Sequence, residues 1–220
     1  LVGELVISHA LVGQDPVLVE TNNVRLSKNI TQMGKVTRAI QDHVLLLRMV
    51  PLSAFFQKMN RLVRDLSASL GKRIQLKISG EHTEIDKSVI EELSDPMVHL
   101  IRNSIDHGIE APDKRKAAGK PELGMVHLNA YHQSGTVVIE IRDDGGGLNS
   151  ARIRQKAIDK GLIPADAAMT AQEIYQLIFL PGFSTAEKTT EVSGRGVGMD
   201  VVKENIRKIG GRVELASEEG

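Results

Sequence analysis

A regular spacing of apolar side chains near the N-terminus most constrains what this chain can fold into. Seven residues, alternately four and three positions apart, form a heptad seam that is apolar except at Thr37: Leu26, Ile30, Met33, Thr37, Ile40, Val44 and Leu47. A seam of this period predicts a long helix that lies against another helix. Pro51 interrupts the seam, and a second apolar stripe then runs over residues 52–70 until Gly71 stops it.

We therefore expect residues 1–70 to form an all-α helical hairpin. An apolar helical segment over residues 1–12 precedes the seam, and turn residues separate the two. Because two helices cannot enclose a core, the seam is expected to pair with a second copy in a dimeric four-helix bundle. The alternative is that it packs on the rest of the same chain. The apolar pattern already runs at Leu1, as expected for a piece of a longer protein.

After residue 71 the pattern changes to one typical of an α+β two-layer sandwich over residues 71–220. Alternation predicts strands at 73–79, 126–132, 136–142 and 211–216. Helical periodicity predicts helices at 86–107, 150–160, 171–180 and 196–209. This order of elements predicts a mixed sheet that helices cover on one face.

Composition excludes several classes of function. Lys and Arg together number 28, as do Asp and Glu, so no overall field favours nucleic acid or a membrane surface. The absence of Cys excludes disulfides and thiolate metal sites. No apolar run is long enough to span a bilayer. We expect neither nucleic-acid binding nor direct membrane insertion.

The segment HLIRNSIDHG at residues 99–108 carries most of the functional information. On a helix, His99, Asn103 and His107 lie at i, i+4 and i+8 and share one face. The amide oxygen of Asn103 is a hard ligand that suits Mg²⁺. For this segment taken alone, a solvated polar stripe is the alternative interpretation.

A glycine-rich turn follows the predicted strand at 136–142. Asp143 stands at the end of that strand, where its carboxylate can accept a hydrogen bond from an exocyclic amine such as that of adenine. Glycines at 145–147 have no side chains and allow a planar ring to approach the backbone. An ordinary hairpin turn is the alternative, because Asp-Gly is common turn chemistry.

A second glycine-rich segment, GRGVGMD at residues 194–200, opens the last predicted helix. Alternating glycines at a helix N-terminus expose N–H groups to an anion. A dinucleotide-binding fingerprint is disfavoured because no βαβ unit surrounds the glycines. The polar stretch before them, residues 181–195, indicates a lid over a ligand.

Taken in order, the strings HLIRNSIDHG, DDGGGL, PGFS and GRGVGMD resemble the GHKL ATP-binding superfamily. The resemblance extends over the whole chain to the CheA family of chemotaxis histidine kinases. LVGELVIS and LLLRMVPL are similar to that family's dimerisation domain, and MVHLIRNSIDHGIE, IFLPGFSTAEK and EVSGRGVGMDVVK to its ATP-binding domain. The resemblance implies a hairpin dimerisation domain at 1–70 and a Bergerat-type ATP-binding domain at 71–220, which stops short of the family's final strand.

The resemblance also implies ATP and Mg²⁺ as cofactors. It makes Asn103 the Mg²⁺ ligand and places His99 beside the γ-phosphate, so that these two are the expected catalytic residues. The other nucleotide contacts that it implies are Asp106 and His107 near the phosphates and sugar, Asp143 with Gly145 and Gly147 at adenine, Arg152, the lid residues Ser184 and Thr185, and Arg195, Gly196 and Gly198 at the phosphates.

His99 discriminates among members of the superfamily. Members that hydrolyse ATP, such as gyrase, the Hsp90 chaperone and MutL, have Glu four residues before the Asn. An imidazole can take a proton from an incoming histidine and suits water activation less well. The resemblance therefore implies a protein histidine kinase that acts in trans within a dimer. A GHKL ATPase acting as a conformational clamp and a non-catalytic ATP-binding scaffold are the alternatives.

The resemblance implies partners outside this sequence. The acceptor histidine is expected on a separate phosphotransfer domain of the same protein. Response regulators, a CheW-like coupling protein and chemoreceptors are expected to act through missing domains, at cytoplasmic receptor arrays. His9 is not expected to be the acceptor, because Ala10 follows it where conventional sensor kinases have an acid.

Overall fold

The computed structural model describes residues 2–17, 23–183 and 198–220, and the chain divides into two compact units, Leu1–Val50 and Pro51–Gly220. This division falls about 20 residues before the expected boundary near residue 70. The difference arises because helix α4 (Ser53–Leu70) buries its apolar face, including Phe56 and Val63, in the core of the second unit.

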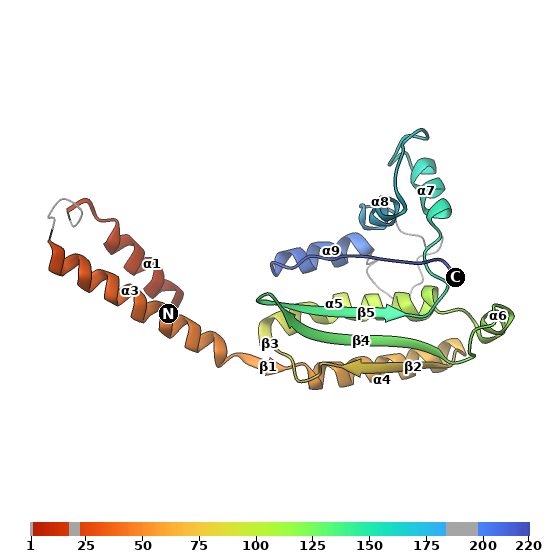
Figure 1. Ribbon diagram of the computed structural model, residues 1–220, viewed down its shortest axis with the longest axis horizontal. Helices are drawn as coiled ribbons and strands as arrows, with labels where there is room; N and C mark the ends of the chain where they lie inside the picture. The colour runs from red at the N-terminus through yellow and green to blue at the C-terminus, as the bar shows by residue number, and fades with distance from the viewer. Residues whose placement is uncertain (1, 18–22, 184–197) are drawn as a thin grey trace. The chain divides into compact units, whose positions relative to one another are not determined.

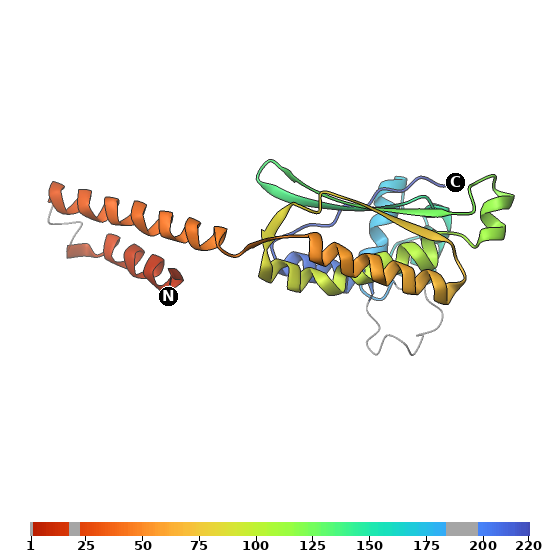
Figure 2. The ribbon, with the colours of Figure 1, turned by 90° about the horizontal axis from the view of Figure 1, so that it is seen from below.

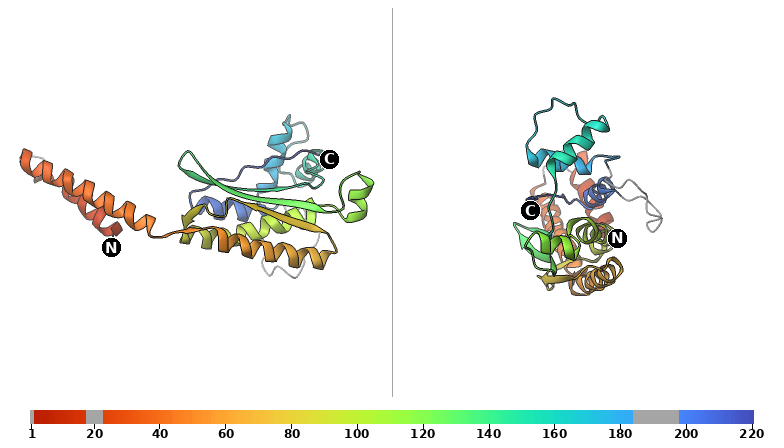
Figure 3. Two further views of the ribbon diagram at one scale, coloured as in Figure 1. Left: turned by 60° about the horizontal axis from the view of Figure 1, so that its bottom comes forward. Right: turned by 90° about the vertical axis from the view of Figure 1, so that its right-hand side faces the viewer.

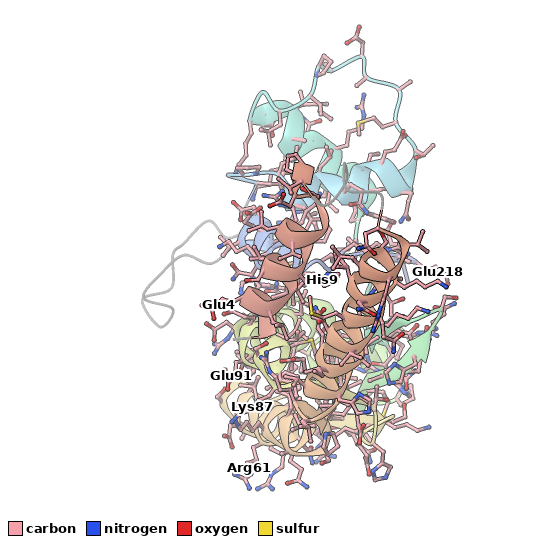
Figure 4. The ribbon with its side chains drawn as sticks, turned by 90° about the vertical axis from the view of Figure 1, so that its left-hand side faces the viewer. Glu4, His9, Arg61, Lys87, Glu91 and Glu218 are labelled. Atoms are coloured by element: carbon pink, nitrogen blue, oxygen red, sulfur yellow. The ribbon has the colours of Figure 1, made fainter. Side chains whose placement is uncertain are left out.

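The first unit is a hairpin of helices α1 (Val2–Gly13) and α3 (Val24–Leu46), which lie side by side (Figure 1). His9 projects from α1 towards α3, and its Nε2 lies 2.8 Å from the carbonyl oxygen of Ile30 (Figure 4). A Cβ on Gly34 would lie 2.6 Å from the His9 ring, so the glycine makes room for it. His9 is thus a packing residue between the two helices of the hairpin. Strand β1 (Met49–Pro51) follows the hairpin.

The second unit is built on a three-stranded mixed sheet in the order β2 (Ile74–Ser79), β4 (Gly124–Gln133), β5 (Thr136–Asp143). β2 runs parallel to β4 and β5 antiparallel to it, with Ile78 opposite Leu128 and Leu128 opposite Ile141. The parallel pair requires a long crossover, which passes through β3 (Glu84–Asp86), α5 (Lys87–Asn103) and α6 (Pro112–Ala117).

Helices α4, α5 and α9 (Met199–Lys208) cover one face of this sheet (Figures 2 and 3). The predicted two-layer arrangement is therefore present. α4 ends at Gly71, whose φ of 62° allows the left-handed cap that stops a helix. Between the layers lies an aliphatic core whose most buried members include Leu52, Phe56, Val63, Ile101, Ile105, Val126 and Leu128.

A smaller apolar cluster follows β5. It consists of α7 (Ser150–Asp159), α8 (Ala171–Gln176) and the 3₁₀ turn η2 (Leu177–Phe179). Thr170 and Glu173 form a reciprocal capping box that starts α8. The cluster's buried members are Ile153, Ala157, Ile174, Tyr175, Leu177 and Phe183.

The strand predicted at 211–216 is wrong. Residues 211–220 are described but join no ladder, although Val213 and Leu215 alternate in burial with their exposed neighbours. Alternating burial shows that one side of the extended segment packs against the protein. A β-strand also requires backbone hydrogen bonds to a neighbouring strand. This segment instead contacts the turn after β5, where Ser217 Oγ accepts from the Leu148 amide. Within the described part of the chain, no helix is long and apolar enough to cross a membrane.

Candidate functional site

The predicted polar helix is α5, and it ends in a π-helical turn, η1 (Ser104–Gly108). The turn is closed by a hydrogen bond from the Ile109 amide to Ser104 O, five residues back, at 2.8 Å. A π-turn inserts a residue into the helical repeat and often occurs at functional sites. His99 and Asn103 are half-buried, whereas His107 is exposed. His99 and Asn103 therefore have the similar burial expected of residues on one helix face. His107, which lies in the π-turn, is more exposed than they are.

Lys72 holds the carbonyl end of η1. Its Nζ donates to Ile105 O at 2.7 Å, to Asp106 O at 2.8 Å and to Ile109 O at 2.7 Å. An ammonium has three protons, so these carbonyls use all of them. Burial lowers the pKa of Lys72, and the nearby carboxylates of Asp106 and Glu110 oppose this effect. The shape of η1 therefore depends on a residue that precedes it by more than 30 positions.

His99 lies on α5 one turn before Asn103, in surroundings that keep it neutral. Burial of the imidazole is the main cause that lowers the pKa of His99, followed by the positive charges of Arg102 and His107. A neutral imidazole has one ring nitrogen with a free lone pair, which can accept a proton. The site thus contains a half-buried base.

Asn103 contacts the first residue of α9. Its Nδ2 donates to Sδ of Met199 at 3.2 Å. This contact joins the helix of the first motif to the helix that follows the second glycine-rich motif. Gly198 is the N-cap of α9 and has no side chain to occupy the helix amides.

The glycine turn, residues 143–147, lies directly against the end of η1. The Gly145 amide donates to Asp143 Oδ1, and the Gly146 amide donates to Gly108 O, both at 3.1 Å. A Cβ on Gly145 would lie 2.0 Å from Gly108 O, so no side chain fits there. Two motifs that are far apart in the sequence, residues 99–108 and the glycine turn, are therefore in backbone contact.

Gly147 has a different neighbour. Its φ is 70°, and a Cβ on it would lie 2.0 Å from Glu218 O in the C-terminal segment. The contact with Glu218 accounts for this glycine without a ligand, so its expected contact with adenine stays a prediction.

The remaining predicted residues are less closely tied to these contacts. Asp106 and His107 are exposed neighbours on η1, with Oδ2 and Nε2 3.8 Å apart. Arg152 is exposed on α7, and its backbone amide donates to the cap residue Asn149. Four further predicted residues lie outside the described part of the chain: Ser184, Thr185, Arg195 and Gly196.

A family model described as "Histidine kinase-, DNA gyrase B-, and HSP90-like ATPase" matches residues 92–220, more than half of the chain. The chain belongs to this ATPase family. The matched region contains His99, Asn103, the glycine turn and Gly198. It begins within α5, so the first unit and α4 lie outside it.

Over its whole length this ATPase-family chain is similar to CheA proteins. It is 48% identical over 221 residues to "Chemotaxis protein CheA" of Rhizobium meliloti, covering 100% of this chain and 29% of that protein. It is 49% identical over 225 residues to "Chemotaxis protein CheA" of Salmonella typhimurium, covering 100% and 33%. It is 50% identical over 197 residues to "Sensor histidine kinase CheAY" of Helicobacter pylori, covering 89% and 24%. The chain thus spans a third or less of these relatives.

Among solved structures, the blue-light activated histidine kinase of Erythrobacter litoralis EL346 is a distant match. It superposes with a TM-score of 0.44 at 13% identity, covering 99% of this chain and 54% of that chain.

The residues of the site fit the nucleotide that the ATPase family implies. Asp143 Oδ1 accepts from the Gly145 amide, and among the described residues none donates to Oδ2. Oδ2 can therefore accept a hydrogen bond from the amine of adenine. Gly145 has no side chain, so the ring can approach the backbone next to Asp143. The described residues include no cluster of three or more His, Cys, Asp or Glu suited to a metal. The residue of the site that would hold Mg²⁺ is Asn103, through its hard amide oxygen Oδ1 and together with the nucleotide's own phosphates.

Sequence reasoning missed the residues behind the glycine turn. Arg115 on α6 is only 1% exposed and forms ion pairs with Glu110 and Asp144, and Lys120 pairs with Glu110. The only signal was an acid at 110 followed by bases five and ten positions later. That spacing matches neither helix nor strand, so it could not be told from a solvated charged loop.

Proposed function

We propose that this chain is the nucleotide-binding kinase core of a CheA-type chemotaxis histidine kinase. It binds Mg·ATP between α5, the glycine turn and the start of α9. It then transfers the γ-phosphoryl group to a histidine on a separate phosphotransfer domain of the same protein, in trans within a homodimer. The observation that carries this proposal is His99, a half-buried imidazole whose burial favours the neutral form. It stands at the position where the resemblance implies a glutamate in the members that hydrolyse ATP.

Transfer to a histidine requires a base that takes the proton of the acceptor imidazole, whereas hydrolysis requires a base that activates water. A lone pair on the acceptor imidazole forms the N–P bond, and the bond from the γ-phosphorus to the bridging oxygen breaks to release ADP. The acceptor's other ring nitrogen loses its proton to neutral His99. Mg²⁺ neutralises charge on the phosphates when it is bound. Positioning by the chain supplies most of the remaining rate.

The proposed nucleotide contacts are supported by the proximity of the motifs in the structure. Asp143 and Gly145 take the adenine, Asn103 takes Mg²⁺, and Gly198 presents the amides of α9 to the phosphates. The other proposed contacts are drawn from the resemblance alone: Asp106, His107, Gly147, Arg152, Ser184, Thr185, Arg195 and Gly196.

Labelled ATP tests the proposal directly. The chain is incubated with γ-labelled ATP and a separately produced phosphotransfer domain, and the label on the domain and in free phosphate is measured. We expect the domain to be labelled with little phosphate released. Steady phosphate release without the acceptor supports the conformational-clamp ATPase instead. Nucleotide binding with neither outcome supports the scaffold.

The variant His99→Gln separates binding from transfer. It should retain nucleotide affinity and lose transfer. His127→Gln is the matched control, because His127 lies on β4 in the sheet, opposite Arg142 of β5. Transfer by His99→Gln at the wild-type rate would show that His99 is not the base.

We also propose a homodimer formed through the hairpin. α1 covers the side of α3 that contains Ile30, Gly34 and the buried Thr37, and leaves much of the heptad seam bare. A bare seam of this period favours pairing with a second hairpin. Its exposed fractions are 46% at Met33, 42% at Ile40, 37% at Val44 and 85% at Leu47.

Sedimentation tests the dimer. Ile40→Asp places a charge in the proposed interface and should yield a monomer, whereas Lys28→Asp on the same helix should leave the dimer intact. A wild-type chain that sediments as a monomer at micromolar concentrations contradicts this part of the proposal. Response regulators, a CheW-like coupling protein and chemoreceptors are proposed to act through other segments of the full-length protein.

A further inference from the structure

Arg115 is a cation whose side chain is 1% exposed, and charged side chains are almost never so buried unless paired. Its five N–H groups all have acceptors. Nε donates to Pro121 O at 2.8 Å, and Nη1 donates to Glu110 Oε2 and to Asp144 O, each at 3.1 Å. Nη2 donates to Leu123 O at 3.4 Å and to Asp144 Oδ2 at 2.8 Å. A guanidinium has five donors in a fixed plane, so its orientation is fully determined.

Lys120 reinforces the same contacts from the adjoining loop. Its Nζ donates to Glu110 Oε1 at 3.0 Å and to Gly145 O at 2.9 Å. Burial alone would raise the pKa of Glu110, but hydrogen bonds from its own backbone, Lys120 and Arg115 outweigh this and lower it. Glu110 therefore stays ionised between the two cations.

These contacts end on the glycine turn, at Asp144 and at the carbonyl oxygen of Gly145. Asp144 is fixed twice, because Oδ2 takes Arg115 and Oδ1 takes the Met125 amide of β4 at 2.9 Å. On its other side the turn meets Gly108 through the Gly146 amide. Figure 1 shows α6, which carries Arg115, beyond the C-terminal end of β5.

We propose that Arg115 is a positioning residue of the nucleotide site: its guanidinium fixes Asp144, and through it sets where Asp143 and Gly145 stand against Gly108. This inference rests on the proposed function, in which Asp143 accepts from the amine of adenine. Arg115 touches no reacting atom and acts only through the glycine turn. A purely structural role would stabilise the fold without affecting how well the site recognises that amine.

The test compares two nucleotides in equilibrium binding to the whole chain: ATP and purine riboside triphosphate, which lacks the 6-amino group. The wild type should prefer ATP by about tenfold, the value of one hydrogen bond to a charged group. In Arg115→Lys the ammonium has only three donors, so the turn shifts and the preference should shrink to about twofold. Arg154→Lys is the matched control, because Arg154 donates to Ala165 O and Ala167 O in the loop between α7 and α8, away from the glycine turn in the sequence.

If Arg115→Lys weakens both nucleotides equally and keeps the wild-type preference, the role is structural and the proposal is overturned. Should that variant fail to fold, Asp144→Asn keeps the side-chain shape and should shrink the preference in the same direction. Amide exchange in the nucleotide-free chain separates this inference from the proposed function. We expect exchange at 144–147 to rise about tenfold in Arg115→Lys and not in Arg154→Lys. Unchanged exchange there overturns the inference even if the wild type shows no preference for ATP.

Discussion

The carboxamide of Asn103 is oriented by the thioether of Met199, to which its Nδ2 donates at 3.2 Å. A thioether sulfur has no proton and can only accept, so the amide nitrogen must face it. The amide oxygen then faces the other way, and within the described chain no residue donates to it. Met199 thus leaves Oδ1 available as a ligand for a hard cation.

Met199→Leu should weaken Mg²⁺ binding in the presence of ATP. Leucine keeps the apolar volume and removes the acceptor, so Asn103 loses its preferred orientation. The loss of about 1 kcal/mol raises the dissociation constant for Mg²⁺ about fivefold and leaves metal-free nucleotide affinity unchanged. Titration of Mg²⁺ into the ATP complex measures this. Met97→Leu is the control, because Met97 is a buried core residue of α5, the helix that carries Asn103. Wild-type Mg²⁺ affinity in Met199→Leu would contradict the orienting role.

The pKa of His99 should lie below its ordinary value of 6.5, and NMR titration of its ring proton measures it. Burial is the main cause of the lowered pKa, and substitution of a neighbouring charged residue does not change it. The charge of Arg102, the second cause, can be removed by substitution. Arg102→Gln should therefore raise the pKa, and His107→Gln should raise it by less. Because only neutral His99 is a base, transfer is lost as pH falls through this pKa. The acid limb of the rate should move to higher pH in Arg102→Gln. A limb that stays in place while the pKa moves would mean that another group is titrating.

Periodic elements and local motifs could be predicted from the sequence. α5 buries Leu93, Met97 and Ile101 at helical spacing, and β4 alternates with period two. The strand-end position of Asp143 and the glycines after it are local features as well.

Features set by contacts between distant residues could not be predicted. η1 depends on Lys72, which no local pattern relates to Ile109. α4 belongs to the second unit because its apolar stripe packs in the core of that unit. The stripe predicts an amphipathic helix and does not indicate which core the helix joins. The C-terminal segment has the alternation of a strand without a partner, because hydrogen bonding is not encoded in alternation.

Lys72→Met should destabilise the second unit. Three carbonyls at the end of η1 lose their donor, and we expect the free energy of unfolding to fall by about 1–3 kcal/mol. Urea denaturation followed by circular dichroism measures this. Lys72→Arg should not restore stability, because a planar guanidinium cannot place three donors at one point. Lys77→Met, on an exposed position of β2, is the control and should change little. Equal stability of Lys72→Met and Lys77→Met would show that η1 holds its shape without Lys72.

Gly145→Ala and Gly146→Ala form a matched pair within the glycine turn. A Cβ at 145 would lie 2.0 Å from the Gly108 carbonyl oxygen, a backbone atom that cannot yield without opening the contact between the turn and η1. A Cβ at 146 would lie 3.4 Å from Glu110 Oε1, which is an ordinary van der Waals contact. Overpacking against backbone costs about 1–3 kcal/mol, so Gly145→Ala should weaken ATP binding about fivefold or more. Gly146→Ala should bind ATP within about twofold of the wild type. Calorimetric titration of both variants measures the difference. Equal affinities would show that the nucleotide does not depend on how closely the turn approaches Gly108.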